Sequence, residues 1–391
     1  MNADRPPADI GETTLEDKVR FLSMAGSYPG TVHRADTRQT HMSWLFLTES
    51  RVYKLKKPVR FPYLDFSTLE KREAACRAEL ELNRRLARPT YLDVVPLRLS
   101  SQGLSFDKGS IVEWIVVMRR LDAQVALESL IGTHSVDVVQ LERLVRRLAE
   151  FYRQARRVYM SPDALVADWH RRISYDQRLL SDRRFALPAG TARRIGWAQR
   201  RFLDRYSSLL AERVRKRWIV DGHGDLRPEH IWLGEPVQII DCIEFNPHLR
   251  TVDPLDELAY LSVECERLGA AWVGEYVARH IARQFHEDVP DALFAFYRCH
   301  RASLRARLAI AHLLDPHART PEKWPRVARD YLRIAEGEAA KLERLFSAHS
   351  GLAACDRTGG DFLTQIKKVW RQPPHIRNAA RLGAGPEAAR A

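Results

Sequence analysis

Apolar and polar residues alternate near the start of the chain in a way that predicts β-strands. Residues 40–57 (THMSWLFLTESRVYKLKK) contain two apolar runs around a polar turn, which is the pattern of a strand pair. In the second run, VYKLKK, alternation places Lys54 and Lys56 on the same face as Val52, while the tyrosine and leucine between them face the other way. Two lysines therefore project from one side of a predicted strand.

A helix and further strands follow this pair. Ser67 and Glu70 have the spacing of a capping box and predict a helix that runs to about Leu86. The segments 92–100 and 110–118 are β-rich and are separated by serine- and glycine-containing turns. The first 120 residues thus predict a mostly antiparallel sheet with one prominent helix.

The rest of the chain changes to helical periodicity. Helices are expected at about 136–157, 163–181 and 191–215, and nearly everywhere from 254 to 347. The predicted fold class is α+β with two lobes, a small antiparallel-sheet N-lobe and a large, mainly helical C-lobe that contains one β-hairpin. The expected boundaries are a disordered lead-in at 1–14, the N-lobe at 15–120, the C-lobe at 121–350, and an extension at 351–391 that is largely disordered after about 372.

Composition narrows the class of protein. The 391 residues are 45% hydrophobic and carry a formal charge of +13, and no window approaches 18 consecutive apolar residues, so no membrane span is predicted. Five scattered cysteines without a CxxC pair, and an N-terminus without a signal-peptide pattern, predict reduced thiols and a cytoplasmic location. The excess charge sits largely in arginines of predicted helices, which favours solvated faces or a phosphate-bearing small molecule over nucleic acid.

The stretch DGHGDLRPEHIWL, residues 221–233, concentrates polar groups before an apolar strand. It continues into a turn and a second strand that ends at Asp241, so folding back at the turn places His230 beside Asp241, with Asp225 on the preceding loop. Two carboxylates and an imidazole at one end of a hairpin suit a hard divalent ion and a hydroxyl to be deprotonated. Alternatively, the stretch is a polar loop with Asp225 as a turn residue.

The motifs together resemble the aminoglycoside-phosphotransferase-like branch of the protein-kinase-like fold, and most closely an uncharacterised bacterial group in which some members carry an added P-loop ATPase domain. The family's catalytic loop reads HGDxxxxN, and this chain has HGDLRPEH followed by IWLGEPVQIID. The resemblance includes VYKLKK, RAELELNRRL, VVMRRL and VDPLDELAYL in the expected order, and it spans most of residues 40–310.

The resemblance implies an ATP-dependent kinase with Mg²⁺, or Mn²⁺, as its metal. Asp225 would be the catalytic base and Asp241 would bind the metal that bridges the phosphates. Arg227, two residues after the base, could stabilise charge in the transition state; alternatively it is a surface arginine that closes the loop.

The resemblance also implies a nucleotide site in the N-lobe. Lys54 would pair with the α- and β-phosphates and Glu79 would hold it, although Lys56 is a rival for the first role and Glu73 and Glu81 are rivals for the second. In the segment QTHMSW, Thr40, His41 and Ser43 could present hydroxyls or amides to phosphates, or form a polar strand edge. Backbone groups near Met118 would meet the adenine edge.

One position departs from the family pattern. The asparagine five residues after the base is His230 here, and imidazole suits Mg²⁺ less well than a carbonyl oxygen does. Either a metal site is lost, or His230 holds the loop by hydrogen bonding, or the metal preference shifts.

Three nearby positions are expected to support the loop. His223 would brace it by hydrogen bonding, and Gly224 would allow a backbone conformation that a side chain obstructs. Asp253 and Pro254 form a predicted helix start. By the resemblance Asp256 would reach back to the loop; alternatively it is an acid that suits the first turn of that helix.

The leading functional hypothesis is phosphorylation of a hydroxyl on a small molecule. The segment 157–218, expected to build the acceptor pocket, is strongly basic, so a polycationic acceptor is disfavoured. The alternative is a pseudokinase that acts as a nucleotide-binding regulatory or interaction module, which leaves a protein partner open. Only eleven residues separate Asp241 from Asp253, which disfavours a protein-kinase activation segment.

Overall fold

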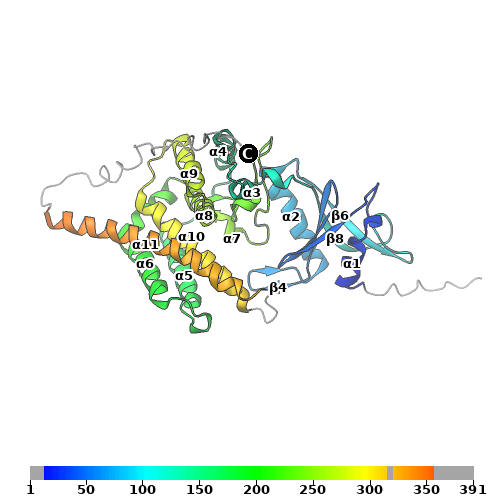
Figure 1. Ribbon diagram of the computed structural model, residues 1–391, viewed down its shortest axis with the longest axis horizontal. Coiled ribbons are helices and arrows are strands. Elements are labelled where there is room, and N and C mark those ends of the chain that lie inside the picture. Colours follow the sequence, from blue (N-terminus) through cyan, green and yellow to red (C-terminus); the bar gives the residue numbers. More distant parts are fainter. Residues whose placement is uncertain (1–12, 315–319, 356–391) are drawn as a thin grey trace, which may run out of the picture.

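The computed structural model describes residues 13–314 and 320–355, and these form two lobes (Figure 1). A sheet-rich N-terminal lobe lies at one end of the molecule and a helical C-terminal lobe at the other. The predicted α+β, two-lobed class is confirmed. Most of the predicted lead-in and the tail after 372 lie outside the described residues.

The N-lobe is built around one antiparallel sheet. In order across the sheet its strands are β1 (Asp36–Gln39), β2 (Ser43–Leu47), β3 (Arg51–Lys56), β8 (Ser110–Arg119), β6 (Tyr91–Ser100) and β7 (Gly103–Ser105). Two helices accompany it, α1 (Leu15–Leu22) and α2 (Leu69–Ala87). The paired strands and the helix predicted from residues 40–118 are therefore present.

The two faces of this sheet pack against different partners. Tyr53 and Leu55 of β3 belong to an apolar cluster that includes Leu22 of α1. Val116 and Met118 of β8 belong to a second cluster, on the α2 side of the sheet. Because strand side chains alternate, Lys54 and Lys56 share one face, as the sequence pattern predicts, and that face meets α2.

The helix start differs in one detail from the prediction. Thr68, and not Ser67, is the N-cap of α2, and its hydroxyl accepts a hydrogen bond from the Lys71 amide at 3.3 Å. Ser67 instead binds Asp65 through both its amide and its hydroxyl. Both hydroxyl residues satisfy the N-cap preference, and the spacing to Glu70 favoured Ser67, because Thr68 has a lysine, Lys71, three residues later.

The C-lobe packs its helices around one large apolar core. These helices are α3 (Leu127–Gly132), α4 (Val138–Gln154), α5 (Pro162–Leu180), α6 (Ala189–Arg215), α7 (Pro247–Arg250), α8 (Pro254–Arg267), α9 (Ala271–Gln284), α10 (Asp291–Ala311) and α11 (Lys323–Cys355). None of the helices within 13–314 and 320–355 is long and apolar enough to cross a membrane.

Short strand pairs hold the loops of the C-lobe that carry the polar stretch. The predicted hairpin is present as β10 (Ile231–Trp232) and β11 (Gln238–Ile239). A second pair, β9 (Val220–Asp221) with β12 (Thr251–Val252), joins the start of the polar stretch to the start of α8. The segments around 221–230 and 241–252 are thereby fixed side by side.

One small element was not predicted from the sequence. Strands β4 (Arg60–Phe61) and β5 (Leu64–Asp65) form a hairpin between β3 and α2. Its two-residue strands are too short to show alternation.

Candidate active site

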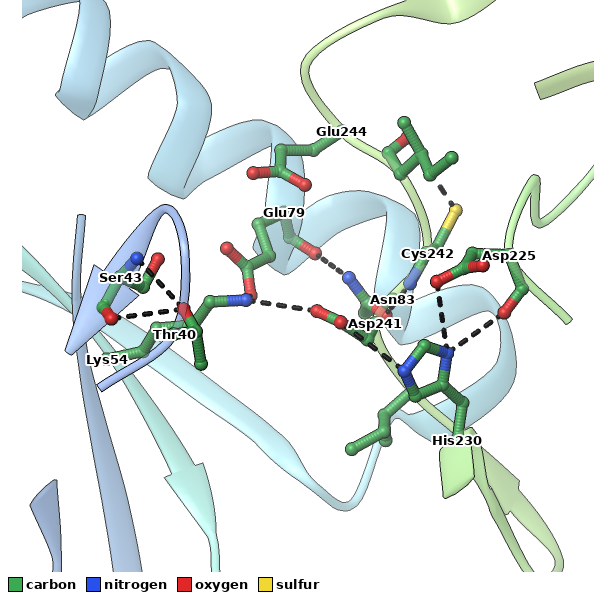
Figure 2. A network of polar contacts seen from close by, with 12 residues as sticks. Thr40, Ser43, Lys54, Glu79, Asn83, Asp225, His230, Asp241, Cys242 and Glu244 are labelled. Atoms are coloured by element: carbon green, nitrogen blue, oxygen red, sulfur yellow. Dashed lines mark hydrogen bonds and ion pairs between the residues drawn. The ribbon is translucent and has the colours of Figure 1, made fainter. Parts of the chain in front are cut away.

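Lys54 of β3 lies between two carboxylates that come from different lobes (Figure 2). Its Nζ is 2.8 Å from Glu79 Oε1 on α2 and 3.0 Å from Asp241 Oδ1, just after β11. The Lys54 and Asp241 side chains retain 14% and 46% exposure, while the Glu79 side chain is buried. The three linked charged groups are therefore accessible to solvent mainly at Asp241.

The charges of this group stabilise one another. Burial disfavours the ionised form of Asp241, but Lys54 outweighs that effect and holds the pKa of the carboxyl well below its usual range. Burial also opposes charge on Glu79, and Lys54 and Lys56 together lower its pKa. Both carboxylates are therefore ionised at neutral pH, the form in which Asp241 can bind a cation and Glu79 can pair with Lys54.

The rival residues lie in different surroundings. Lys56 Nζ is 2.6 Å from Glu79 Oε2 and also contacts Glu244, and its side chain is 1% exposed. Glu73 pairs with Arg77 near the surface. Lys54 is thus the lysine of β3 that contacts Asp241, and Glu79 is the glutamate of α2 that pairs with it.

A buried glutamate of α8 fixes the loop before the hairpin. Glu257 in the first turn of α8 accepts hydrogen bonds from the backbone amides of His223, at 2.8 Å, and of Gly224. Gly224 has φ +87, and a Cβ there would lie 3.0 Å from the Leu249 carbonyl oxygen. A glycine is therefore needed for both the backbone angle and the space.

The predicted role of His223 as a brace agrees with its contacts. Its Nε2 lies 2.9 Å from the Ile240 carbonyl oxygen, and its Nδ1 accepts a hydrogen bond from the Asp225 amide at 3.2 Å. The ring thus ties the loop to the end of the second hairpin strand. Burial lowers the pKa of His223 to about 4, so the ring is neutral at physiological pH.

Asp225 stands next to an arginine and a histidine. Its Oδ2 is 2.9 Å from Arg227 Nη2 and 3.6 Å from His230 Nδ1. Burial opposes its ionisation, but Arg227 and His230 outweigh this and lower the pKa of the carboxyl. Arg227 also pairs with Glu229 at 2.5 Å. Asp225 is therefore a carboxylate at neutral pH, held in place by its neighbours.

His230 lies between the two aspartates (Figure 2). Its Nδ1 is 2.9 Å from the Asp225 carbonyl oxygen, to which it donates, and its Nε2 is 3.2 Å from Arg227 Nη2 and 3.6 Å from Asp241 Oδ2. Both ring nitrogens thus have protein partners. These contacts favour hydrogen bonding of the loop among the alternatives for this position.

The oxygens available for a metal come mainly from Asp241. Within the described ranges, no group of three or more His, Cys, Asp or Glu side chains is arranged to hold an ion by itself. A half-exposed carboxylate fits a hard ion that keeps waters and phosphate oxygens as its other ligands, which is the usual mode of Mg²⁺. The His230 Nε2 fits such an ion poorly because it faces the Arg227 guanidinium.

The predicted phosphate loop forms a compact turn between β1 and β2. The Thr40 hydroxyl donates to the Ser43 carbonyl oxygen and accepts from the Ser43 amide, both at 3.0 Å. Those two groups therefore stabilise the turn. The exposed His41 side chain stacks on Phe61 of the β4–β5 hairpin, with ring centroids 4.8 Å apart.

Met118 lies near the end of β8, pairs with Val52 and Tyr91, and is buried in the α2-side cluster. The chain leaves the N-lobe directly after this strand. This is the position from which backbone groups could meet an adenine edge.

The start of α8 corrects one prediction. Asp253 is the N-cap and Pro254 the first helical residue, as predicted, but Asp256 does not reach the loop. Its carboxylate accepts two hydrogen bonds from Arg301, both at 2.6 Å. Glu257, the next residue, makes the loop contact because the helix turns it toward the hairpin.

Two further side chains support Asp241 and were not predicted. The Tyr91 hydroxyl accepts from the Asp241 amide at 3.2 Å, and Asn83 Oδ1 accepts from the Cys242 amide at 2.9 Å. Asp241 has φ +62, an uncommon conformation for a residue with a side chain. Asn83 lies four residues after Glu79, on the same face of α2, and this spacing was the available sequence signal.

The neutral His223 predicts a distinct acid response. Its pKa is about 4 in the folded chain and about 6.5 when unfolded, so on acidification the unfolded chain takes up the proton first. This group should therefore lower the free energy of unfolding by roughly 3 kcal/mol as the pH falls from about 6.5 to about 4, and contribute no pH dependence above that window. Urea unfolding of the wild type and His223→Gln across this range measures the difference. Equal pH slopes for the two proteins would contradict a buried neutral imidazole.

Comparison with known proteins gives relatives but no matching family model. Uncharacterised proteins of Mycobacterium tuberculosis and Mycobacterium bovis are 33% identical over 280 residues, which cover 70% of this chain and 54% of theirs. The chain therefore spans about half the length of the curated relatives it matches.

Solved structures of low identity are also similar. The GDP complex of aminoglycoside 2'-phosphotransferase-IIIa is 17% identical, covering 83% of this chain and 99% of that one, with a TM-score of 0.49. A choline/ethanolamine kinase family protein from Mesorhizobium loti is 16% identical, covering 84% and 93%, with a TM-score of 0.45. Since one fold carries many functions, the roles of residues here rest on the geometry of this chain.

Proposed function

We propose that the protein is an ATP-dependent phosphotransferase that phosphorylates a hydroxyl group of a small molecule. The observation that carries this proposal is the contact of Lys54 with Glu79 and Asp241 at the junction of the two lobes. Asp225 lies on the other side of His230 from Asp241. Phosphoryl transfer requires mainly positioning and neutralisation of charge. These residues supply both.

Each residue has a definite task in the proposed reaction. Lys54, held by Glu79, binds the phosphates of the nucleotide, and Asp241 holds the divalent ion. When bound, ATP would supply the phosphoryl group, and its divalent ion would withdraw charge from that group. Asp225 accepts a hydrogen bond from the acceptor hydroxyl and takes its proton as the new bond from oxygen to the γ-phosphorus forms and the bond to ADP breaks.

The low pKa of Asp225 fits this order of events. A carboxylate stabilised by Arg227 is a weak base, so it orients the hydroxyl first and gains the proton late. A loose transition state makes little demand on early deprotonation. Arg227, 2.9 Å from Asp225, is placed to offset charge on the transferring group.

The charges near Asp225 favour a neutral or anionic acceptor. Arg227 and Arg305 both lower the pKa of the base through their positive charge. A polycationic acceptor would be repelled by these groups. The acceptor class is therefore a neutral or acidic hydroxyl compound.

Formation of ADP with panels of hydroxyl compounds tests the proposal. Neutral and anionic compounds, assayed with Mg²⁺ and with Mn²⁺, are expected to include acceptors that raise ADP formation above the background, and polycationic compounds are not. Binding of ATP without ADP formation for any compound and either metal would instead support the pseudokinase alternative, in which the same site serves regulation or interaction.

A further inference from the structure

We propose that Lys56 and Glu244 are positioning residues whose ion pair holds Asp241 in place for its metal and keeps Glu79 fixed when Lys54 turns to phosphate. This inference rests on the proposed function. It gives a role to Lys56, the second lysine of β3, which has no task in the proposed reaction. It also gives a role to Glu244, three residues after Asp241.

The two lysines of β3 each connect the same two elements. Lys54 Nζ binds Glu79 Oε1 on α2 and Asp241 Oδ1, and Lys56 Nζ binds the other Glu79 oxygen and the Glu244 carboxylate. Figure 2 shows Glu79 and Glu244 together with Lys54 and Asp241. The segment 241–244 is thus attached to β3 and α2 at two points.

The two halves of this network differ in access. The Lys54 and Asp241 side chains retain 14% and 46% exposure, whereas those of Lys56, Glu79 and Glu244 retain 1%, 1% and 9%. Lys56 Nζ also lies 4.9 Å from the centre of the Phe66 ring. A nucleotide could therefore reach the Lys54 half and not the Lys56 half.

Binding of a nucleotide requires the exposed half to exchange partners. Lys54 and Asp241 neutralise each other in this structure, and each would turn to a ligand, the lysine to phosphate and the aspartate to the ion. Glu79 would then share Lys54 with phosphate. Because Lys56 keeps the second oxygen of Glu79, the glutamate stays ionised and in place during this exchange.

Asp241 needs such an anchor because its backbone is in the left-handed region, with φ +62. A conformation of this kind persists only where the surroundings fix it. Tyr91 and Asn83 bind the backbone amides of Asp241 and Cys242. Glu244 supplies the charged attachment on the far side of the segment, through Lys56.

Metal binding without turnover tests the pair. The affinity for Mn²⁺ is measured by electron paramagnetic resonance in the presence of the non-hydrolysable analogue AMP-PNP, and the affinity for AMP-PNP alone by calorimetry. Lys56→Met and Glu244→Gln each remove one partner with little change of shape. Both are expected to weaken Mn²⁺ binding on the order of tenfold, the effect of losing a charge-assisted bond, with a smaller change for AMP-PNP without metal because Lys54 remains.

A matched control exists in the same lobe. Lys18 Nζ is 3.0 Å from Glu113 Oε2, Arg72 shares the other oxygen at 2.7 Å, and all three side chains are nearly buried. Lys18→Met therefore removes a buried lysine from a shared glutamate away from Asp241. It should lower the melting temperature and leave Mn²⁺ affinity unchanged.

The outcomes separate the two proposals. If Lys56→Met and Glu244→Gln only lower the melting temperature, as Lys18→Met does, the pair is structural and the inference is overturned. If Lys56→Met does not fold, the Mn²⁺ affinity of Glu244→Gln tests the inference, since Lys56 still binds Glu79 in that variant. If the wild type binds neither AMP-PNP nor Mn²⁺ with AMP-PNP, the proposed function itself fails and the role of the pair falls with it.

Discussion

Replacing Asp225 by asparagine is expected to lower phosphoryl transfer by roughly 10²–10⁴-fold, the usual contribution of a positioned general base. Asparagine keeps the volume of the side chain and removes the group that takes the proton. Nucleotide affinity should be retained, because Asp225 pairs with Arg227 whereas Lys54 pairs with Glu79 and Asp241. Single-turnover rates and AMP-PNP affinity, measured on the same samples, provide the comparison.

Glu229→Gln is the matched control for this loss. Glu229 lies on the same loop and pairs with the same arginine as Asp225 does. Its side chain is partly exposed, and an ion pair of that kind contributes little, so a change of about fivefold at most is expected. An Asp225→Asn rate within the range of this control would show that Asp225 is not the base.

The second large effect is expected from Lys54→Ala, which should weaken both nucleotide binding and transfer. Loss of charge-assisted hydrogen bonds to phosphate corresponds to about 1.5–3 kcal/mol, or roughly 10- to 150-fold in the dissociation constant of AMP-PNP. The fold should survive because Glu79 keeps its bond to Lys56. Calorimetry, together with a melting curve, measures the two consequences separately.

The control for Lys54 is a lysine outside the junction of the lobes. Lys71 near the start of α2 pairs with Asp65 and is half-exposed, so Lys71→Ala should leave AMP-PNP affinity unchanged. Equal affinities for Lys54→Ala and the wild type would assign the phosphates to another cation and remove the main support for the nucleotide site.

Local patterns predicted the parts of the site that lie within single elements. Alternation in VYKLKK placed two lysines on one face of β3, and the hairpin placed His230 beside Asp241. Both predictions use periodicities and turns that operate over a few residues. The resemblance then connected β3, α2 and the loop, which are far apart in sequence.

Contacts that depend on tertiary packing were beyond these patterns. Asp256 and Glu257 are both acids in the first turn of α8, and only the packing of that helix decides that Glu257 faces the loop while Asp256 meets Arg301. The Lys56–Glu244 pair joins residues 188 positions apart. Its sequence signal is weak, a second lysine two residues after Lys54 and an acid three residues after Asp241.

The central claim is most directly tested by transfer of labelled γ-phosphate from ATP into a small-molecule extract, with Mg²⁺ or Mn²⁺, comparing the wild type with Asp225→Asn. A labelled product is expected with the wild type, and its rate of formation should fall by orders of magnitude with Asp225→Asn. Absence of a labelled product with either metal, in samples where ATP raises the melting temperature, would contradict catalysis and support a nucleotide-binding module.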